Sequence, residues 1–354
     1  MSIVLPHIEA LATYALGEQP PEGVPSVKLN QNESPYPPSP RVLQALRDMS
    51  EEELRRYPDA ACVELRKSLS AKLGIEAERI FCGNGSSEII SLIFKVFIGP
   101  GGSIALPDPS FGLYHTVAAS YQAASKAVPT REDFTVDVDG LLASGAKAIV
   151  LVNPNAPTGL LLSSGEVERL VSGFPGLVVI DEAYIDFAEP GASSLELLSK
   201  YSNVMILRTF SKAYALCGAR VGYCMADRSL IEALEKGRDI YNVNAISRKL
   251  AVAAIEDAGY VNDTIARSNR SRSELTARLR KMGFDVLPSQ TNFVLCAPPV
   301  QEGITAKHIE ERLTEAHIFV RHFDHPRLRG MLRISIGTES EIQQLLSELV
   351  RILA

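Results

Sequence analysis

The stretch AIVLVNPNAPTG, residues 148–159, places an apolar run directly before a polar turn, and the same pattern recurs twice further along the chain. The run at 177–180 leads into Asp181-Glu-Ala-Tyr184, and the run at 204–207 leads into Arg208-Thr-Phe-Ser-Lys212. All three runs are rich in Ile and Val and are apolar on both faces, which is typical of strands covered by helices on both sides. The sequence therefore predicts three buried strands that each end in polar residues.

Strand and helix patterns alternate on either side of this stretch. Further apolar runs lie at 79–83 and 103–109, while segments such as 61–74 and 165–174 have apolar residues three or four positions apart. This alternation predicts an α/β domain, with a mostly parallel sheet sandwiched by helices, over residues 41–250.

The pattern changes after residue 250. A long polar helix is predicted at 262–282, and shorter strands and helices follow it, so we expect a smaller α+β domain over 251–354. Residues 1–40 are interrupted by Gly and Pro, which predicts an N-terminal arm and an extended segment that lies across another surface.

Length, charge and cysteine content exclude several classes of protein. The chain has 354 residues and a formal net charge of −6, which gives no general attraction for nucleic acid or anionic lipid. The five cysteines are scattered, and the six histidines have no metal-ligand spacing, so we expect reduced thiols and no metal site. The first residues do not resemble a signal peptide and no run is long enough to span a membrane, so we expect a cytoplasmic protein.

Three side chains after the apolar runs form the candidate site. Open parallel sheets bind ligands just beyond the carboxyl ends of their strands, where Asn153, Asp181 and Lys212 are expected to meet. Each residue alone has a simpler explanation. Asp181 could cap the segment that follows it, Lys212 could be an ordinary solvated lysine, and Asn153 could serve the turn. Their joint occurrence at one sheet edge favours a site.

A lysine, a carboxylate and an amide at one edge suit pyridoxal 5'-phosphate. Its aldehyde condenses with a lysine amine, and its ring nitrogen works best when it is protonated beside a carboxylate. Opposite charges at ~4 Å with an effective dielectric constant of ~20 interact by roughly 4 kcal/mol, which corresponds to about three pKa units. A carboxylate at Asp181 would therefore keep the ring protonated at neutral pH.

The motifs resemble those of the fold-type I, class I/II pyridoxal-phosphate-dependent aminotransferases. The similarity rests on NPNAPTG at 153–159, DEAY at 181–184 and TFSKAYALCGARVGY at 209–223, with Arg220 eight residues after Lys212. Within the family, the chain is most similar to the histidinol-phosphate branch. This similarity rests on LNQNE at 29–33, RYPD at 56–59, GSSE at 85–88, PSFGLY at 109–114 and LRISIGT at 332–338. The implied fold is that of aspartate aminotransferase.

The resemblance implies a role for each matching residue around the cofactor. Lys212 would bond to the cofactor and move the substrate proton, Asp181 would pair with the ring nitrogen, and Asn153 and Tyr184 would contact the 3-oxygen. Phe111 would stack on the ring, where this branch usually has Tyr. Phosphate contacts would come from Gly85, Ser86, Ser87, Thr209, Ser211 and Arg220 and, from the neighbouring subunit, Tyr57. A plain helix cap at Ser86 and a surface turn at Tyr57 are the simpler alternatives.

The substrate side is implied in the same way. Arg333 lies between Leu332 and Ile334 in a predicted strand, where an Arg needs an anion or a buried partner. The resemblance implies that Arg333 binds an anionic group of the substrate. Further substrate contacts are implied for Arg321, Tyr14, Asn30 and Asn153. The shared Tyr57 implies a homodimer whose active sites are built by both subunits.

The implied reaction is the transfer of an amino group from a small-molecule donor to a 2-oxo acid. The expected pair is histidinol phosphate and 2-oxoglutarate, which would give imidazole acetol phosphate and glutamate in histidine biosynthesis. An aromatic or broad-range amino-acid aminotransferase and a threonine-phosphate decarboxylase share most of these motifs and stay open. A non-catalytic, DNA-linked relative is disfavoured because the chain has no basic run, and a nicotinamide dehydrogenase because no G-x-G-x-x-G follows an early strand.

Overall fold

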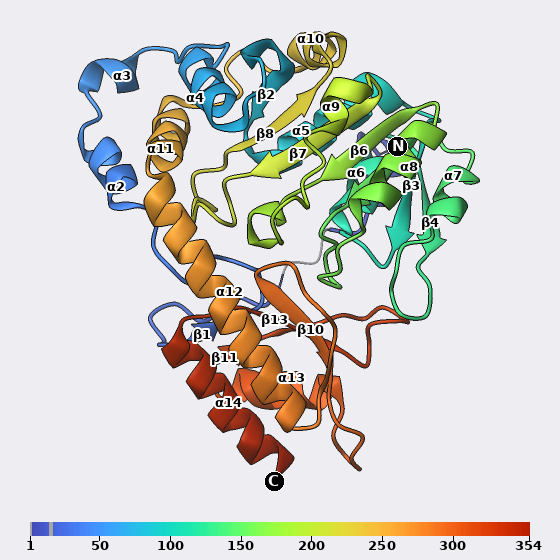
Figure 1. Cartoon of the computed structure of the whole chain (residues 1–354), viewed down its shortest axis with the longest axis vertical. Helices are drawn as coiled ribbons and strands as arrows, with labels where there is room; N and C mark the ends of the chain where they lie inside the picture. The colour runs from blue at the N-terminus through green and yellow to red at the C-terminus, as the bar shows by residue number, and fades with distance from the viewer. Residues whose placement is uncertain (1, 14–16) are drawn as a thin grey trace.

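A seven-stranded sheet forms the centre of the larger of two units in the computed structural model, which describes residues 2–13 and 17–354 (Figure 1). The strand order is β2-β8-β7-β6-β5-β3-β4; β8 runs antiparallel to both β2 and β7, and the other neighbouring strands are parallel. The strands are β2 (Ile80–Gly83), β3 (Ser103–Asp108), β4 (Ala124–Pro129), β5 (Ala148–Val152), β6 (Leu177–Asp181), β7 (Val204–Thr209) and β8 (Gly222–Ala226). The predicted α/β class is confirmed, and the carboxyl ends of β5, β6 and β7 lie at one edge.

Helices cover both faces of this sheet, which explains why its central strands are apolar on both sides. In β5, Ile149 and Leu151 enter one core while Ala148, Val150 and Val152 enter the other. The first core also contains residues of α4 (Val63–Leu73), α7 (Val138–Leu142), α8 (Ser164–Gly173) and α11 (Ala245–Glu256). The second contains residues of α5 (Gly85–Ile93), η2 (Phe94–Ile98), α6 (Leu113–Ser120) and α10 (Arg228–Gly237). Short helices complete the unit: α2 (Pro40–Arg47), α3 (Glu51–Arg55), η1 (Ala77–Arg79), η3 (Ile185–Phe187) and α9 (Leu197–Lys200).

The smaller unit is built on a four-stranded antiparallel sheet in the order β12-β13-β10-β9. Three helices pack with it in a separate core, in which α14 lies beside α12 (Figure 1). The elements are α12 (Ala258–Lys281), β9 (Asp285–Val286), β10 (Phe293–Ala297), α13 (Ala306–Glu315), β12 (Arg321–His322), β13 (Leu332–Ser335) and α14 (Glu339–Leu353).

The border between the two units, which was expected near residue 250/251, falls in a helical part of the chain. That position lies inside α11, and residues 250–255 and Val261 pack in a core of the larger unit. The small-unit core takes its first residues of α12 at Leu275 and Leu279, so this 24-residue helix passes from one unit to the other. The apolar spacing of a helix shows that it is amphipathic, but not which core its apolar face enters.

The described part of the N-terminal segment, which was expected to lie across another surface, contacts both units of the chain. The short helix α1 (Pro6–Glu9) contacts α6 of the larger unit. Further along, β1 (Val27–Lys28) pairs in parallel with β11 (Ile318–Phe319), and Val27 and Leu29 enter the small-unit core. In the described part of the chain, no helix is long and apolar enough to cross a membrane.

Candidate active site

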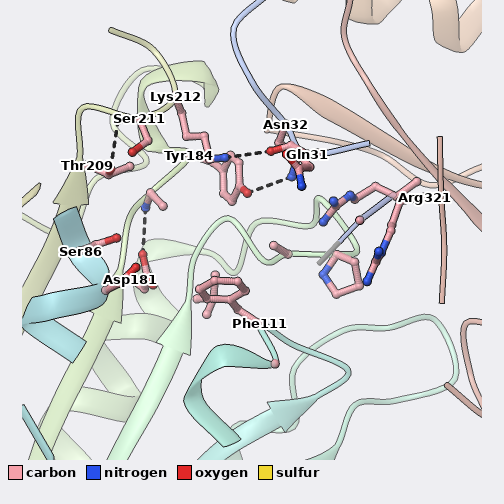
Figure 2. Close-up of a pocket in the computed structure, with 18 of the residues that line it drawn as sticks. Gln31, Asn32, Ser86, Phe111, Asp181, Tyr184, Thr209, Ser211, Lys212 and Arg321 are labelled. Carbon is pink, nitrogen blue, oxygen red and sulfur yellow. Dashed lines mark hydrogen bonds between the residues drawn. The ribbon is translucent and has the colours of Figure 1, made fainter. Parts of the chain in front are cut away.

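A cavity of about 290 Å³ lies where the edge of the large sheet faces the smaller unit (Figure 2). Most of the residues that the sequence singled out line it, although they are far apart in the chain. These are Asn30, Ser86, Ser87, Phe111, Asp181, Tyr184, Thr209, Ser211, Lys212, Arg220, Arg321 and Arg333. The topology thus brings both the expected cofactor residues and the expected substrate residues to one space.

Asp181 ends β6 and points its buried carboxylate into this cavity. Its Oδ2 accepts a hydrogen bond of 2.9 Å from the Tyr114 hydroxyl, and its Oδ1 accepts one of 3.1 Å from the backbone N–H of Ala183. Burial raises the pKa of Asp181 to about 6, against the lowering effect of these two donors. A buried carboxylate in a cavity, rather than a helix cap, is a typical partner for a cationic group of a ligand.

The neighbouring carboxylate, Glu182, points away from the cavity and has a partner of its own. Arg208 on β7 forms a buried ion pair with Glu182 at 2.8 Å, and Ser193 and the backbone N–H of Ser194 donate further hydrogen bonds. Of the two adjacent acids, Asp181 alone therefore faces the cavity.

Lys212 follows β7 and extends its amine into the cavity instead of into bulk solvent (Figure 2). Its Nζ donates a hydrogen bond of 3.1 Å to the backbone carbonyl of Gln31 and lies 5.8 Å from the centre of the Tyr184 ring. Tyr184 is buried, and its hydroxyl oxygen accepts a hydrogen bond of 2.9 Å from Nδ2 of Asn32. The amine and the phenol therefore meet at the same wall.

A group of donors forms a cradle at the first turn of α5. Ser86 and Ser87 are helical residues there, with Asn84 rather than Ser86 in the capping position. Arg220 contacts Ser211 Oγ at 3.3 Å, and a Cβ placed on Gly85 would lie 2.6 Å from its guanidinium. Hydroxyls, a guanidinium and a helix N-terminus are the donor set that binds phosphate. Together with Asp181 and Lys212, this set fits a phosphate-bearing, cationic ring with an aldehyde.

Aromatic and small side chains line the space between this cradle and the smaller unit. Phe111 lies there with its ring edge-to-face against Tyr114, at 6.2 Å and 84°. Ala156 and Ala183 also line the cavity. A flat ring would find an aromatic partner and little steric hindrance at this wall.

Two arginines of the smaller unit form the opposite wall. Arg321 on β12 and Arg333 on β13 are directly paired across an antiparallel ladder, so their side chains leave the same face. Their guanidinium groups lie 5.5 Å and 5.3 Å from the centre of the Phe323 ring, and Arg333 donates a hydrogen bond of 2.8 Å to the carbonyl of Asn30. Two cations on one wall suit a ligand with negative charge.

The side chain of Asn153 bonds to the backbone of its own turn, so its contacts with cofactor and substrate stay a prediction. Asn153 does not line the cavity, because its Oδ1 accepts from the backbone N–H of Leu162 at 2.8 Å and its Nδ2 donates to the carbonyl of Leu162 at 3.2 Å. Ala156 and Pro157 reach the cavity from this turn instead. Asn153 thus serves the turn, which was the simpler explanation of its position.

Another predicted residue, Tyr57, lies outside the cavity. Tyr57 is 81% exposed and stacks on Tyr241, with ring centres 4.5 Å apart, so its contact with a neighbouring subunit stays a prediction. Tyr14 lies outside the described residues. Among the described residues there is no cluster that could hold a metal ion.

Sequence reasoning missed Gln31, Asn32 and Tyr114. All three lie in motifs that were noted, LNQNE and PSFGLY, but the first two were passed over in favour of Asn30 and the third in favour of Phe111. The helical spacing of Phe111 and Tyr114 could have suggested that both side chains face one site.

Comparisons with known proteins agree with this site. The sequence model of the family described as aminotransferase class I and II matches residues 24–349. Histidinol-phosphate aminotransferase 1 of Trichormus variabilis is 40% identical over 335 residues, which cover 95% of this chain and 94% of the relative. Histidinol-phosphate aminotransferase 2 of Rhizobium meliloti is 42% identical over 353 residues, 98% of each chain. The crystal structure of histidinol-phosphate aminotransferase from Sinorhizobium meliloti in complex with pyridoxal-5'-phosphate has a TM-score of 0.90 at 28% identity, covering 100% of this chain and 99% of that one.

Proposed function

The chain belongs to the aminotransferase class I and II family, and from this premise we propose that it transfers the amino group of histidinol phosphate to 2-oxoglutarate. The products are imidazole acetol phosphate and glutamate, and the step belongs to histidine biosynthesis. The chain is an enzyme of the aminotransferase type, with pyridoxal 5'-phosphate as its cofactor. The single observation that supports the substrate class is the Arg321–Arg333 wall, which faces Lys212 across the cavity.

The residues of the larger unit hold the cofactor and move a proton. When bound, pyridoxal phosphate supplies an electron-withdrawing ring that accepts the electron pair of the broken Cα–H bond. Asp181 holds a proton at the ring nitrogen, and the donors near Ser86 and Arg220 hold the phosphate. Lys212 takes the proton from the substrate Cα as a general base and later returns a proton as a general acid. Phe111 stacks on the ring and limits the access of water.

The residues of the smaller unit orient the substrate. Both the amino donor and the 2-oxo acid carry negative groups, so Arg333 and Arg321 serve both half-reactions in turn. Asn30 adds an amide on the same side; its Oδ1 has no hydrogen-bond partner among the described residues, which leaves it able to accept from a ligand. Because these groups line the same cavity as Lys212, a substrate that they hold would have its Cα directed toward that amine.

Two copies of the chain would complete the site. In this proposal the enzyme is a cytoplasmic homodimer in which Tyr57 reaches the cofactor phosphate of the neighbouring subunit. The 81% exposure of Tyr57 supports this role, because a side chain that acts in another subunit is exposed in its own. The five free cysteines are consistent with a reducing compartment.

A donor screen tests the proposed substrate. The cofactor-loaded enzyme is mixed with histidinol phosphate, phenylalanine, tyrosine or aspartate, and the absorbance change of the first half-reaction is followed. We expect kcat/KM for histidinol phosphate to exceed the other values by about 10²-fold, or some 2.7 kcal/mol of barrier. A preference of that size for another donor would identify an aromatic or broad-range enzyme. Release of carbon dioxide from threonine phosphate would instead identify a decarboxylase.

A further inference from the structure

Residues 30–32 form a strap across the cavity and contact three site residues in succession. The carbonyl of Asn30 accepts from Arg333. The carbonyl of Gln31 accepts from Lys212, and Nδ2 of Asn32 donates to the hydroxyl oxygen of Tyr184 (Figure 2). The first two contacts are made by the backbone. The third depends on a side chain, so it is the one that a substitution can test.

Asn32 is held more firmly than a loop residue needs to be. It is 2% exposed and has a φ of 55°, in the left-handed region that Asn tolerates better than most residues. Its backbone N–H donates to Ser335 Oγ at 2.8 Å, and its carbonyl accepts from Asn292 Nδ2 at 2.9 Å. Its side chain therefore has little freedom to turn.

Ser335 determines which end of the Asn32 amide faces Tyr184. Because Ser335 Oγ accepts from the Asn32 N–H, its own hydrogen is available to donate to Asn32 Oδ1, at 2.9 Å. The opposite amide orientation would place an N–H₂ against Ser335 and leave that hydroxyl hydrogen without an acceptor among the described contacts. Nδ2 is thus the end that faces Tyr184.

The direction of this hydrogen bond has a chemical consequence. An amide N–H₂ is a donor only, so the Tyr184 oxygen accepts from Asn32 and its own hydrogen must point elsewhere. Tyr184 lines the cavity beside Lys212, so that hydrogen is available to an oxygen of the ligand. We propose that Asn32 is a positioning residue that directs the hydroxyl hydrogen of Tyr184 toward the cofactor. This proposal rests on the proposed function.

Asn32→Asp and Asn32→Gly separate this role from a structural one. Asp keeps the shape and the bond from Ser335 but can only accept from Tyr184, so it turns the hydroxyl hydrogen away from the cavity. Gly removes the amide and suits the positive φ without reversing the bond. We expect pyridoxal phosphate to bind about tenfold more weakly to the Asp variant, which corresponds to one lost hydrogen bond, and about threefold more weakly to the Gly variant. Equilibrium dialysis gives the dissociation constants, and the absorption band of the bound cofactor is recorded at one fixed pH.

A purely structural role predicts the reverse order. The isosteric Asp would then resemble the wild type and Gly would be the weaker binder, with a lower melting temperature in the absence of cofactor to match. An Asp variant that binds the cofactor no more weakly than the Gly variant would overturn the proposal.

Tyr184→Phe supplies the control for the added charge of Asp. In that background, Asn32→Asp and Asn32→Gly should bind the cofactor within about twofold of each other, because no hydroxyl remains to be directed. A tenfold gap that persists there would assign the effect to charge near Lys212 and refute the proposal. Absence of a cofactor band in the wild type would instead refute the proposed function, so the two failures are distinguishable.

Discussion

The two walls of the cavity are supplied in different ways by the chain. In the large-unit wall, Asp181 ends a strand and Lys212 lies just beyond one, at an edge that parallel strands share. In the small-unit wall, Arg321 and Arg333 lie within strands of an antiparallel sheet and project from one face. The first wall holds a carboxylate and an amine, the groups that carry proton chemistry. The second holds cations, which recognise charge.

The two walls also differ in their effect on the stability of the folded chain. Asp181 is buried, and its raised pKa of about 6 shows that the folded chain holds this charge at a disadvantage. Arg333 lies 5.3 Å from the centres of both the Phe293 and Phe323 rings, and cations on aromatic faces are favourable contacts. We infer that the buried Asp181 charge makes the large-unit wall the destabilising one of the two.

Replacement of Lys212 by Ala should have the largest effect on the large-unit wall. Without the amine, no group takes the substrate proton, so we expect turnover to fall by at least about 10³-fold and the yellow absorption band of the bound cofactor to disappear. Absorption spectra and steady-state rates measure both effects. Lys236→Ala, at an exposed lysine, is the matched control. Retained transamination in the Lys212 variant would contradict the assignment of the base.

Asp181→Asn tests whether this wall sacrifices stability for function. We expect activity to fall by about 10²–10³-fold, because the ring nitrogen loses its counter-ion. Because the folded chain has the higher pKa, it binds more protons than the unfolded chain between about pH 4 and 6, and stability is lost as pH rises through that window.

The cofactor-free Asn variant should therefore be more stable than the wild type above pH 6. The gain is about 3 kcal/mol at most, which corresponds to the rise in pKa from 3.8 to about 6. Urea unfolding at pH 5 and pH 7.5 measures it, and the gain should be smaller at pH 5. Equal gains at both values would show that the Asp181 charge is not the cause.

Arg333→Met tests the small-unit wall alone. We expect kcat/KM for anionic substrates to fall by about 10²-fold, since a charged hydrogen-bonding partner is lost, while the cofactor band stays unchanged. Arg329→Met, at an exposed arginine of the smaller unit, is the control. Loss of the cofactor band in the Arg333 variant would show that the small-unit wall also holds the cofactor.

Tyr57→Phe should have the smallest effect on cofactor binding. It tests whether a neighbouring subunit adds a contact to the two walls. If Tyr57 reaches the phosphate of the neighbouring subunit, its hydroxyl contributes one hydrogen bond, and we expect cofactor to be retained about fivefold less tightly in an intact dimer. Dialysis and sedimentation measure these two properties. Tyr241→Phe, which keeps the stacked pair of rings, should leave retention unchanged. Equal retention in both variants would confine the cofactor site to the two walls of one chain.

Much of the large-unit wall could be predicted from the sequence, because buried parallel strands have a recognisable pattern of apolar residues. The runs that became β5, β6 and β7 were apolar on both faces, and the polar residues after them therefore had to emerge at one edge. Two strands of the large sheet, β4 and β8, were not predicted. Most residues of β4 are at least partly exposed, so it lacks the apolar run that marks the central strands.

The position of Asn153 outside the cavity has a local cause. The turn NPNAPTG offers two amides, and the path of the backbone decides where each one points. Here Asn153 bonds to the backbone of Leu162 and Asn155 to that of Pro109, while Ala156 reaches the cavity. The composition and spacing of the residues do not show toward which side of a turn each side chain points.

The sequence by itself determined the class of the fold and the identity of the large-unit wall, because strand periodicity and the residues that end each strand are local properties of the chain. Only the tertiary structure decided that Gln31 and Asn32 lie against Lys212 and Tyr184, and that α12 enters two cores. These contacts join segments more than 150 residues apart in the chain. They depend on how the two units pack together, and no local pattern encodes that.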